Sequence, residues 1–253
     1  MGLVETEGLI LKSYGLAEAD KIVVFLSEHQ GLVRGVAKGA KRLKSKFGGG
    51  LEPFTIGQIT YFQKEERELV AISQLDLVKS YFDSAADPEF FQKFAYIADL
   101  LTEFAPPHDP NETLYRMVKA CLEAGAQNLH SLESVVLYFE LWLLRLGGYL
   151  PDWNRCQNCK RELGKNENAN LQINYQLLCQ TCGKTKSGWD VSAAERELFH
   201  TAQKISPDKF AVLTTEQLTY VRKLSKILKR IISGILGRDL VGEKVLIMAR
   251  ENG

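Results

Sequence analysis

Short apolar runs separated by polar, glycine-containing stretches occupy the first third of the chain. Five runs are rich in valine, isoleucine and leucine, and we expect strands at residues 3–12, 21–27, 32–37, 54–63 and 69–78. Five short strands with the longest connection after the third are typical of a small closed barrel of the OB type. An SH3-like barrel or an open sheet remains an alternative, because periodicity alone does not determine topology.

The hydrophobic period changes to three and four residues after Val78. Between residues 83 and 150 this period predicts helices, with Asp87-Pro88 at one helix start and Asn111 at the next. Residues 132–146 are apolar nearly all round, as expected for the central helix of a bundle.

Helical periodicity returns after Trp189. Ser192 and Glu195 have the spacing of a capping box, and Thr215 precedes a long amphipathic stretch from about residue 216 to 236. The predicted fold is therefore α+β and multi-domain, with a barrel followed by an interrupted helical domain. We expect a barrel at residues 1–80, helices at 81–150, a small insertion at 151–189 and further helices at 190–253.

The insertion contains two Cys-x2-Cys pairs, with nineteen residues between the inner cysteines. The pairs are Cys156 with Cys159 and Cys179 with Cys182, and an apolar stretch between them is expected to form a hairpin that brings them together. Four sulfur ligands favour zinc or iron over calcium or magnesium, and we expect one tetrahedral Zn²⁺. The site would be structural, because no coordination position is left open for substrate water. Two disulfides, or a degenerate site without metal, are the alternatives.

Charge is distributed unevenly behind a net charge of +1. Residues 31–50, here called the basic segment, contain six basic residues and no acid: Arg34, Lys38, Lys41, Arg42, Lys44 and Lys46. Such a run between two barrel strands favours a contact with phosphate backbones, and Tyr14, Phe47, Tyr61 and Phe62 are candidates for base stacking. A solvated basic loop, with these aromatic rings in the core, is the alternative.

Two other regions complete the charge pattern. Residues 222–238 carry six further basic residues beside the apolar stripe, which is also the pattern of the wet face of an amphipathic helix. Residues 83–150 carry ten acidic against four basic residues. Basic ends and an acidic middle favour one nucleic-acid face and one protein-partner face.

Motifs of catalysis and nucleotide binding are missing from the sequence. Gly183-Lys184-Thr185 lacks the glycine five positions earlier that a P-loop needs, and the four histidines stand singly. The start of the chain has no signal-peptide pattern, and its most apolar run is interrupted by Glu140 and Arg145. We therefore expect a cytoplasmic binding protein that is not an enzyme, with no membrane and no nucleotide partner.

Several stretches resemble the RecO family of bacterial recombination mediators. They are residues 20–23 (DKIV), 31–40 (GLVRGVAKGA), 51–54 (LEPF) and 146–149 (LGGY), in the family's order over nearly the whole chain. The resemblance implies an OB-fold protein of the RecF pathway of DNA repair and recombination. Such a protein binds single- and double-stranded DNA, anneals complementary strands and acts at the nucleoid.

The resemblance also implies partners and sites. With RecR, and through the acidic C-terminal tail of single-strand-binding protein, such a protein helps to load RecA at gaps. The basic segment would be the DNA surface. The tail-binding surface would lie in the helical domain, where the cationic helix with Arg222, Lys226 and Lys229 is our candidate. A zinc-ribbon protein that binds RNA or the ribosome is the competing hypothesis, and a metal-dependent nuclease is disfavoured by the closed cysteine site.

Overall fold

The computed structural model describes residues 2–16, 18–63, 68–150, 152–184 and 188–238. The chain divides into two compact units, Met1–Leu129 and His130–Gly253, which are treated one after the other. Among the described residues, no helix combines the length and the apolar character that crossing a membrane requires.

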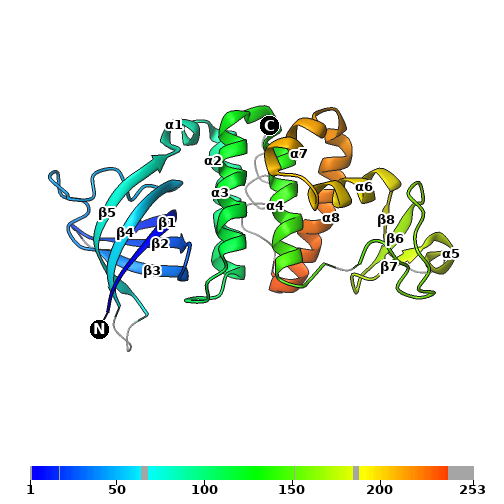
Figure 1. Cartoon of the computed structure of the whole chain (residues 1–253), viewed down its shortest axis with the longest axis horizontal. Helices are drawn as coiled ribbons and strands as arrows, with labels where there is room; N and C mark the ends of the chain where they lie inside the picture. Colours follow the sequence, from blue (N-terminus) through cyan, green and yellow to red (C-terminus); the bar gives the residue numbers. More distant parts are fainter. Residues whose placement is uncertain (1, 17, 64–67, 151, 185–187, 239–253) are drawn as a thin grey trace, which may run out of the picture. The chain divides into compact units, whose positions relative to one another are not determined.

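The first unit contains a closed five-stranded barrel (Figure 1). Its strands are β1 (Gly2–Gly15), β2 (Lys21–Ser27), β3 (Gly31–Ala37), β4 (Thr55–Gln63) and β5 (Val70–Ser80), in the order β1-β2-β3-β5-β4. The β3–β5 pair is parallel and the other pairs are antiparallel. The prediction of an OB-type barrel is confirmed.

Strand β1 closes the barrel because it pairs with two neighbours. Residues 2–9 pair with β4 and residues 8–15 pair with β2, so the two pairings overlap at Gly8 and Leu9. A Cβ atom at Gly8 would lie 2.8 Å from Ile59 Cδ1 and 2.9 Å from the Phe25 ring. Only glycine allows this close approach where the strand changes partner.

Inward-facing side chains fill the barrel. They come from all five strands and also from the connection between β3 and β4, which contributes Phe47 and Leu51. The strand residues in this core are Ile10, Val23, Phe25, Val33, Ala37, Ile59, Tyr61, Val70, Ile72 and Leu75. The alternation of inward apolar and outward polar positions explains why the strands were predictable.

Helices α1 (Phe82–Ala85), α2 (Pro88–Phe104) and α3 (Glu112–Gln127) belong to the same unit. The Phe54 ring makes edge contacts with Phe90, Phe91 and Phe94 of α2, with centroids 5.9–6.2 Å apart. Helix α3 is joined to β1 through the Glu7 carboxylate, which accepts hydrogen bonds from Tyr115 Oη (2.9 Å) and Lys119 Nζ (2.6 Å).

The second unit is built around α4 (Leu132–Leu146), with α6 (Ala193–Ala202), α7 (Pro207–Leu213) and α8 (Leu218–Leu236) packed against it. Most of α4 is buried, as predicted for a central helix. Its few polar groups are paired across the bundle. The Ser134 hydroxyl accepts from Thr214 Oγ1 (2.7 Å), and the buried Glu140 carboxylate accepts from Ser225 Oγ (2.7 Å).

Helix starts follow the predicted caps in three cases. The side chains of Asp87, Asn111 and Ser192 accept from the backbone of α2, α3 and α6, and Glu195 completes the capping box. Thr215 is different, because its hydroxyl donates back to the carbonyls of Ala211 and Val212 in α7. A short 3-10 turn, Thr215–Gln217, therefore precedes α8.

The cysteine insertion lies between α4 and α6 in the chain and is here called the knuckle (residues 151–189). It contains a three-stranded sheet in the order β7-β6-β8, from β6 (Ala169–Gln172), β7 (Leu177–Cys179) and β8 (Gly188–Val191). The short helix α5 (Gln180–Gly183) follows β7. The predicted hairpin is the antiparallel β6–β7 pair.

Candidate nucleic-acid interface and metal site

The basic segment lies on the surface of the barrel. Arg34 is an outward residue of β3, and the other five cations follow in the connection to β4. The six exposed cationic side chains are Arg34, Lys38, Lys41, Arg42, Lys44 and Lys46. The structure thus places all six predicted residues on β3 and the turns that follow it.

Several contacts anchor this segment to the barrel. The Gly39 amide donates to Asp20 Oδ1 (2.8 Å), and the Lys41 amide donates to the Ala19 carbonyl (2.9 Å). Further along the segment, Phe47 is only 4% exposed and packs in the barrel core. Backbone hydrogen bonds form consecutive turns before and after Phe47, between residues 39 and 52. The backbone is therefore held in place while the cationic side chains point outward.

The cations of this segment are largely uncompensated. Within the described residues, no carboxylate lies within 4.0 Å of Arg34, Lys38, Arg42, Lys44 or Lys46. Two acids that contact or adjoin the segment are engaged elsewhere: Asp20 accepts the Gly39 amide, and Glu52 pairs with Lys21 (2.8 Å). Unpaired exposed cations on a fixed backbone give a persistent positive potential, which attracts polyanions.

For two of the four aromatic residues considered as stacking candidates, the alternative of a core position holds. Phe47 and Tyr61 are buried in the barrel core, because each occupies an inward position of the sheet or its connection. Tyr14 and Phe62 are 49% and 39% exposed, so their rings are accessible to a ligand. Sequence alone could not separate the two groups, since all four rings stand in or beside strands of similar composition.

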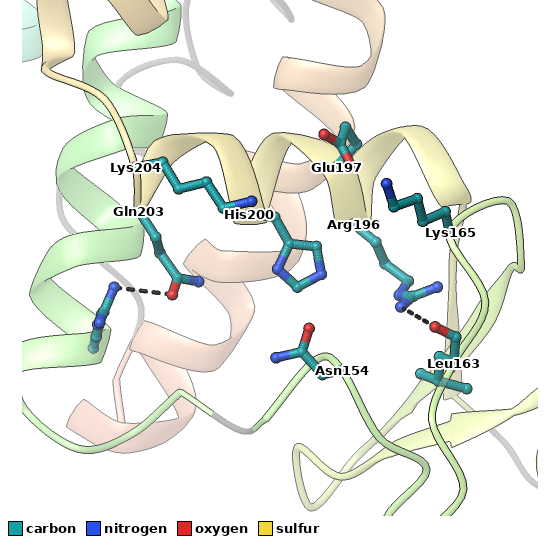
Figure 2. A pocket seen from close by; sticks show the side chains of 9 residues that line it. Asn154, Leu163, Lys165, Arg196, Glu197, His200, Gln203 and Lys204 are labelled. Atoms are coloured by element: carbon teal, nitrogen blue, oxygen red, sulfur yellow. Dashed lines mark hydrogen bonds between the residues drawn. The ribbon is translucent and has the colours of Figure 1, made fainter.

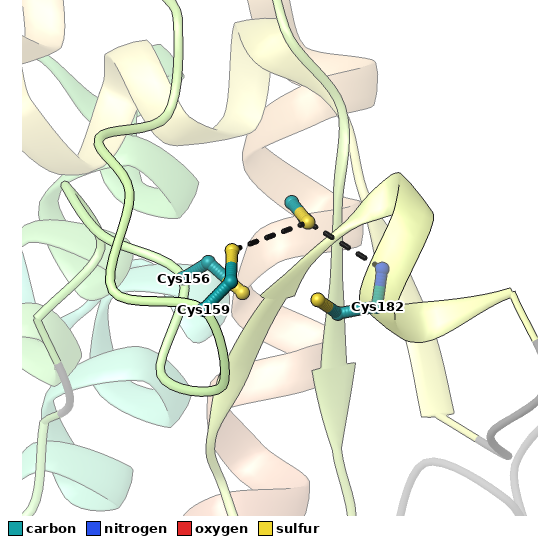
Figure 3. Close-up of side chains that lie close together, drawn as sticks. Cys156, Cys159 and Cys182 are labelled. Carbon is teal, nitrogen blue, oxygen red and sulfur yellow. Dashed lines mark hydrogen bonds between the residues drawn. The ribbon is translucent and has the colours of Figure 1, made fainter.

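The four cysteines of the two pairs converge in the knuckle (Figure 3). All are free thiols, and their sulfur atoms lie within 4.8 Å of one another, with Cys159 Sγ 4.0 Å from Cys179 Sγ. Tetrahedral coordination with Zn–S bonds of about 2.3 Å separates sulfurs by about 3.8 Å. The cluster of Cys156, Cys159, Cys179 and Cys182 can therefore bind one metal ion with little movement.

Local backbone structure produces this convergence. The carbonyl of Cys156 accepts the Lys160 amide (2.9 Å), and Lys160 has φ of 62°, so the first pair sits in a tight turn. In the second pair, Cys179 ends β7, and its sulfur accepts the Cys182 amide (3.4 Å). A strand end followed by one helical turn places both sulfurs on one side.

The electrostatics of the cluster also suit a cation. Burial raises the pKa of the Cys156 thiol, but backbone N–H groups directed at it outweigh burial and lower its pKa to about 6. The same kind of contact from the Cys182 amide lowers the pKa of Cys179. Thiolates are the form that binds metal, so backbone N–H groups favour this state at Cys156 and Cys179. At Cys182 a hydrogen bond from Asn158 lowers the pKa, but the neighbouring cysteine sulfurs outweigh it and raise the pKa to about 11.

Helix α8 carries the residues predicted for partner binding. Its apolar stripe is buried in the bundle, and Lys226 is exposed. Arg222 donates to Glu133 Oε2 of α4 (2.6 Å), and Lys223 pairs with Glu195 (3.2 Å). Arg222 and Lys223 therefore stabilise the bundle, and Lys226 and Lys229 continue the basic face of α8 along the helix.

One buried arginine was not predicted from the sequence. Arg196 of α6 is 3% exposed, and its guanidinium donates to the carbonyls of four knuckle residues: Trp153, Leu163, Gly164 and Glu167. A basic residue in the first turn of an amphipathic helix is normally solvated, so the sequence held no signal for this role. The arginine ties the knuckle to the bundle.

A closed OB-type barrel with an exposed basic segment, followed by helices that carry a four-cysteine cluster, defines a barrel-based binding protein. Comparison with known proteins gives a more specific assignment. Residues 1–81 match the family model "Recombination protein O N terminal", and residues 94–242 match "Recombination protein O C terminal". The chain belongs to the RecO family of DNA repair and recombination proteins.

Individual relatives support this assignment. The DNA repair protein RecO of Koribacter versatilis is 32% identical over 161 residues, which cover 64% of this chain and 65% of the relative. That of Bifidobacterium longum is 33% identical over 68% of this chain and 71% of the relative. That of Syntrophus aciditrophicus is 25% identical over 96% and 94% of the two chains. The resemblance to the RecO family seen in the sequence is confirmed, and the family is a non-enzymatic one, as expected.

Proposed function

We propose that this protein binds single- and double-stranded DNA through the basic segment and anneals complementary strands. In the same proposal it acts in the cytoplasm with RecR and single-strand-binding protein, and helps to load RecA at gaps. The observation that carries the proposal is the set of six exposed cations held on a closed barrel. Residues 1–80 would contact DNA, residues 151–189 would hold a metal, and residues 81–150 and 190–253 would supply partner surfaces.

The physical reason is the cost of bringing two polyanions together. Annealing requires that phosphate repulsion between strands is screened while the bases stay free to pair. Lysine and arginine side chains that contact phosphates do this and release counterions, so affinity falls steeply with salt. The exposed rings of Tyr14 and Phe62 add sequence-independent stacking without reading bases.

For the metal site, we propose Zn²⁺ held by Cys156, Cys159, Cys179 and Cys182. Four sulfur ligands fill a tetrahedral shell, so the ion would supply cross-linking of the knuckle and no open position for chemistry. Two of the sulfurs, those of Cys156 and Cys179, already accept backbone N–H groups, which orients them toward the centre of the cluster.

For the partner surface, we propose that the acidic tail of single-strand-binding protein contacts α8 around Arg222, Lys226 and Lys229. Lys226 is exposed and supplies the clearest positive charge. Since Arg222 already pairs with Glu133, a tail carboxylate would compete with that pair. Lys226→Glu should therefore weaken tail binding more than Arg222→Glu does.

Charge reversal of the basic segment tests the proposed function. In the triple variant Lys41→Glu/Arg42→Glu/Lys44→Glu, three phosphate contacts are lost. At about 0.7 per contact, the slope of log affinity against log salt should fall by about 2, which corresponds to on the order of 100-fold weaker binding near 0.1 M salt. Fluorescence anisotropy of labelled single-stranded oligonucleotides across a salt series measures both quantities.

The matched control is Lys93→Glu/Arg116→Glu/Lys209→Glu, which changes the net charge equally outside the basic segment. It should retain DNA binding close to that of the unmodified protein. If the two triple variants behave alike, the basic segment is not the DNA surface. A strand-annealing assay with and without tail-bearing single-strand-binding protein then tests the mediator role. Competition by structured RNA separates this function from that of an RNA-binding protein.

A further inference from the structure

A polar hollow of about 460 Å³ opens between the knuckle and α6 within the second unit (Figure 2). Arg145 at the end of α4 and Lys204 just after α6 border one side. Lys165 of the knuckle borders the other, and Arg196, Glu197 and His200 line it from α6. None of these residues belongs to the barrel or to the cysteine cluster.

The hollow is strongly positive. Its lining includes four cationic side chains, those of Arg145, Lys165, Arg196 and Lys204, against the one carboxylate of Glu197. Within the described residues, no carboxylate lies within 4.0 Å of Lys165 or Lys204, and both lysines are exposed. An unpaired cation costs little in water, but four that share one concave surface repel each other unless an anion is bound.

Arg196 adds a charge that nothing nearby neutralises directly. All of its donors are used on backbone carbonyls, and the neighbouring Glu167 carboxylate is engaged by Arg161. Burial lowers the pKa of Arg196 from its ordinary value, yet a guanidinium remains protonated at neutral pH. Its positive charge is therefore felt in the hollow, although it cannot itself donate to a ligand.

The remaining side chains can donate hydrogen bonds to an oxyanion. Arg145 uses one N–H group on Gln203 Oε1 (2.9 Å) and stacks its guanidinium over Trp142, which leaves further donors. Burial and the charge of Arg196 lower the pKa of His200, which favours the neutral imidazole with its one N–H donor. Donors of this kind around a positive centre suit phosphate oxygens.

Among the described residues, the imidazole of His200 is the only ring that lines the hollow. Trp153 and Phe199 stack on each other, with ring centroids 4.7 Å apart, and neither lines it. A volume of 460 Å³ lies in the range of ligand sites and exceeds the needs of one small ion. The hollow therefore fits the sugar-phosphate part of a nucleic acid and does not select a base.

We infer that this hollow is a second phosphate site, which receives the backbone or terminal phosphate of a nucleic-acid strand through Lys165, Lys204 and Arg145. The inference rests on the proposed function only in naming DNA as the source of the phosphate. It gives the second unit a strand contact of its own, separate from the basic segment.

The test uses the full chain with Lys165→Gln/Lys204→Gln, and the matched control Lys184→Gln/Lys209→Gln. The control removes two exposed lysines of the same unit that do not line the hollow. Binding of a fluorescent, 5′-phosphorylated oligothymidylate is followed by anisotropy across a salt series. Loss of two phosphate contacts should lower the salt slope by about 1.4, which corresponds to about 25-fold weaker binding near 0.1 M salt, while the control changes neither.

The same two substitutions are then placed in the Lys41→Glu/Arg42→Glu/Lys44→Glu background. A further loss of the residual binding supports a separate site. If that triple variant binds DNA normally, the proposed function fails, yet the effect of Lys165→Gln/Lys204→Gln still supports the second site. Equal affinity and slope in the hollow variant and its control overturn the inference. Calorimetry with a 5′-phosphorylated dithymidylate and with an oligoglutamate peptide distinguishes the two ligand classes. Binding of the peptide without binding of the dithymidylate also overturns the inference.

Discussion

Replacing Arg196 with methionine should destabilise the second unit without touching the barrel. The guanidinium makes five hydrogen bonds, of 2.8–3.4 Å, to four carbonyls of the knuckle. Methionine fills much of the same volume but donates none of these bonds. The substitution therefore removes this partner from four backbone carbonyls, and the bonds to Trp153 and Leu163 are buried.

The magnitude follows from the number and burial of these bonds. A net value of about 1 kcal/mol per bond gives about 5 kcal/mol for all five. Water can replace the two bonds to Gly164 and Glu167, which are only partly buried, so we expect a loss of about 3–4 kcal/mol. Lysine has three donors, and Arg196→Lys should therefore lose about 2 kcal/mol.

Intrinsic fluorescence suits this measurement because all three tryptophans, Trp142, Trp153 and Trp189, lie in the second unit. Trp153 is fully buried and accepts the Arg196 contact through its own carbonyl. Urea unfolding followed by tryptophan emission reports the free energy of unfolding of this unit. Circular dichroism of the same samples includes the barrel.

Arg155→Met is the matched control, because Arg155 is exposed in the same knuckle and makes one long ion pair with Glu162 (3.3 Å). Its loss should cost less than about 0.5 kcal/mol. If Arg196→Met does not fold, Arg196→Lys provides the measurement. A change below about 1 kcal/mol for Arg196→Met, or equal changes for Arg196→Met and Arg155→Met, would refute the proposed role of these carbonyl contacts.

Two further predictions concern the metal site and the attachment of α3 to the barrel. With Zn²⁺ in the cluster as proposed, Cys159→Ser, Cys182→Ser or treatment with a chelator should cost the second unit several kcal/mol and shift tryptophan emission to the red. DNA affinity should change less than about threefold. A large affinity loss in a well-folded variant would contradict a purely structural site. Glu7→Gln should cost the first unit about 1–2 kcal/mol, because the carboxylate accepts hydrogen bonds from Tyr115 and Lys119 and is only 17% exposed. Thermal unfolding followed by circular dichroism measures this loss. The control Glu5→Gln, at an exposed position of β1, should cost almost nothing. Burial raises the pKa of Glu7, but the hydrogen bonds from Lys119 and Tyr115 outweigh burial and lower this pKa below 4.5. The stabilisation by Glu7 is therefore complete above pH 4.5 and is lost as the pH falls through the folded-state pKa. If Glu7→Gln leaves the pH dependence of stability unchanged, this explanation is wrong.

Several features of this protein are determined locally and could be predicted from sequence. Asp87, Asn111 and Ser192 cap helices because each needs only the backbone amides two or three residues ahead. The strand positions follow from the two-residue period of β structure, and the cysteine pairs follow from the spacing of a tight turn. Exposure of the six cations was predictable too, since charged side chains are costly to bury.

Other features depend on residues distant in sequence, and only the tertiary structure decided them. The parallel pairing of residues 35–37 with residues 70–72 is one of the contacts that complete the ring of strands, and the core of that ring contains Phe47 and Tyr61. The hollow beside α6 exists because Arg196 bonds to carbonyls about thirty to forty residues earlier in the chain. The local sequence pattern shows that side chains alternate between the two faces of a strand. Which of these faces becomes buried depends on packing against segments distant in sequence.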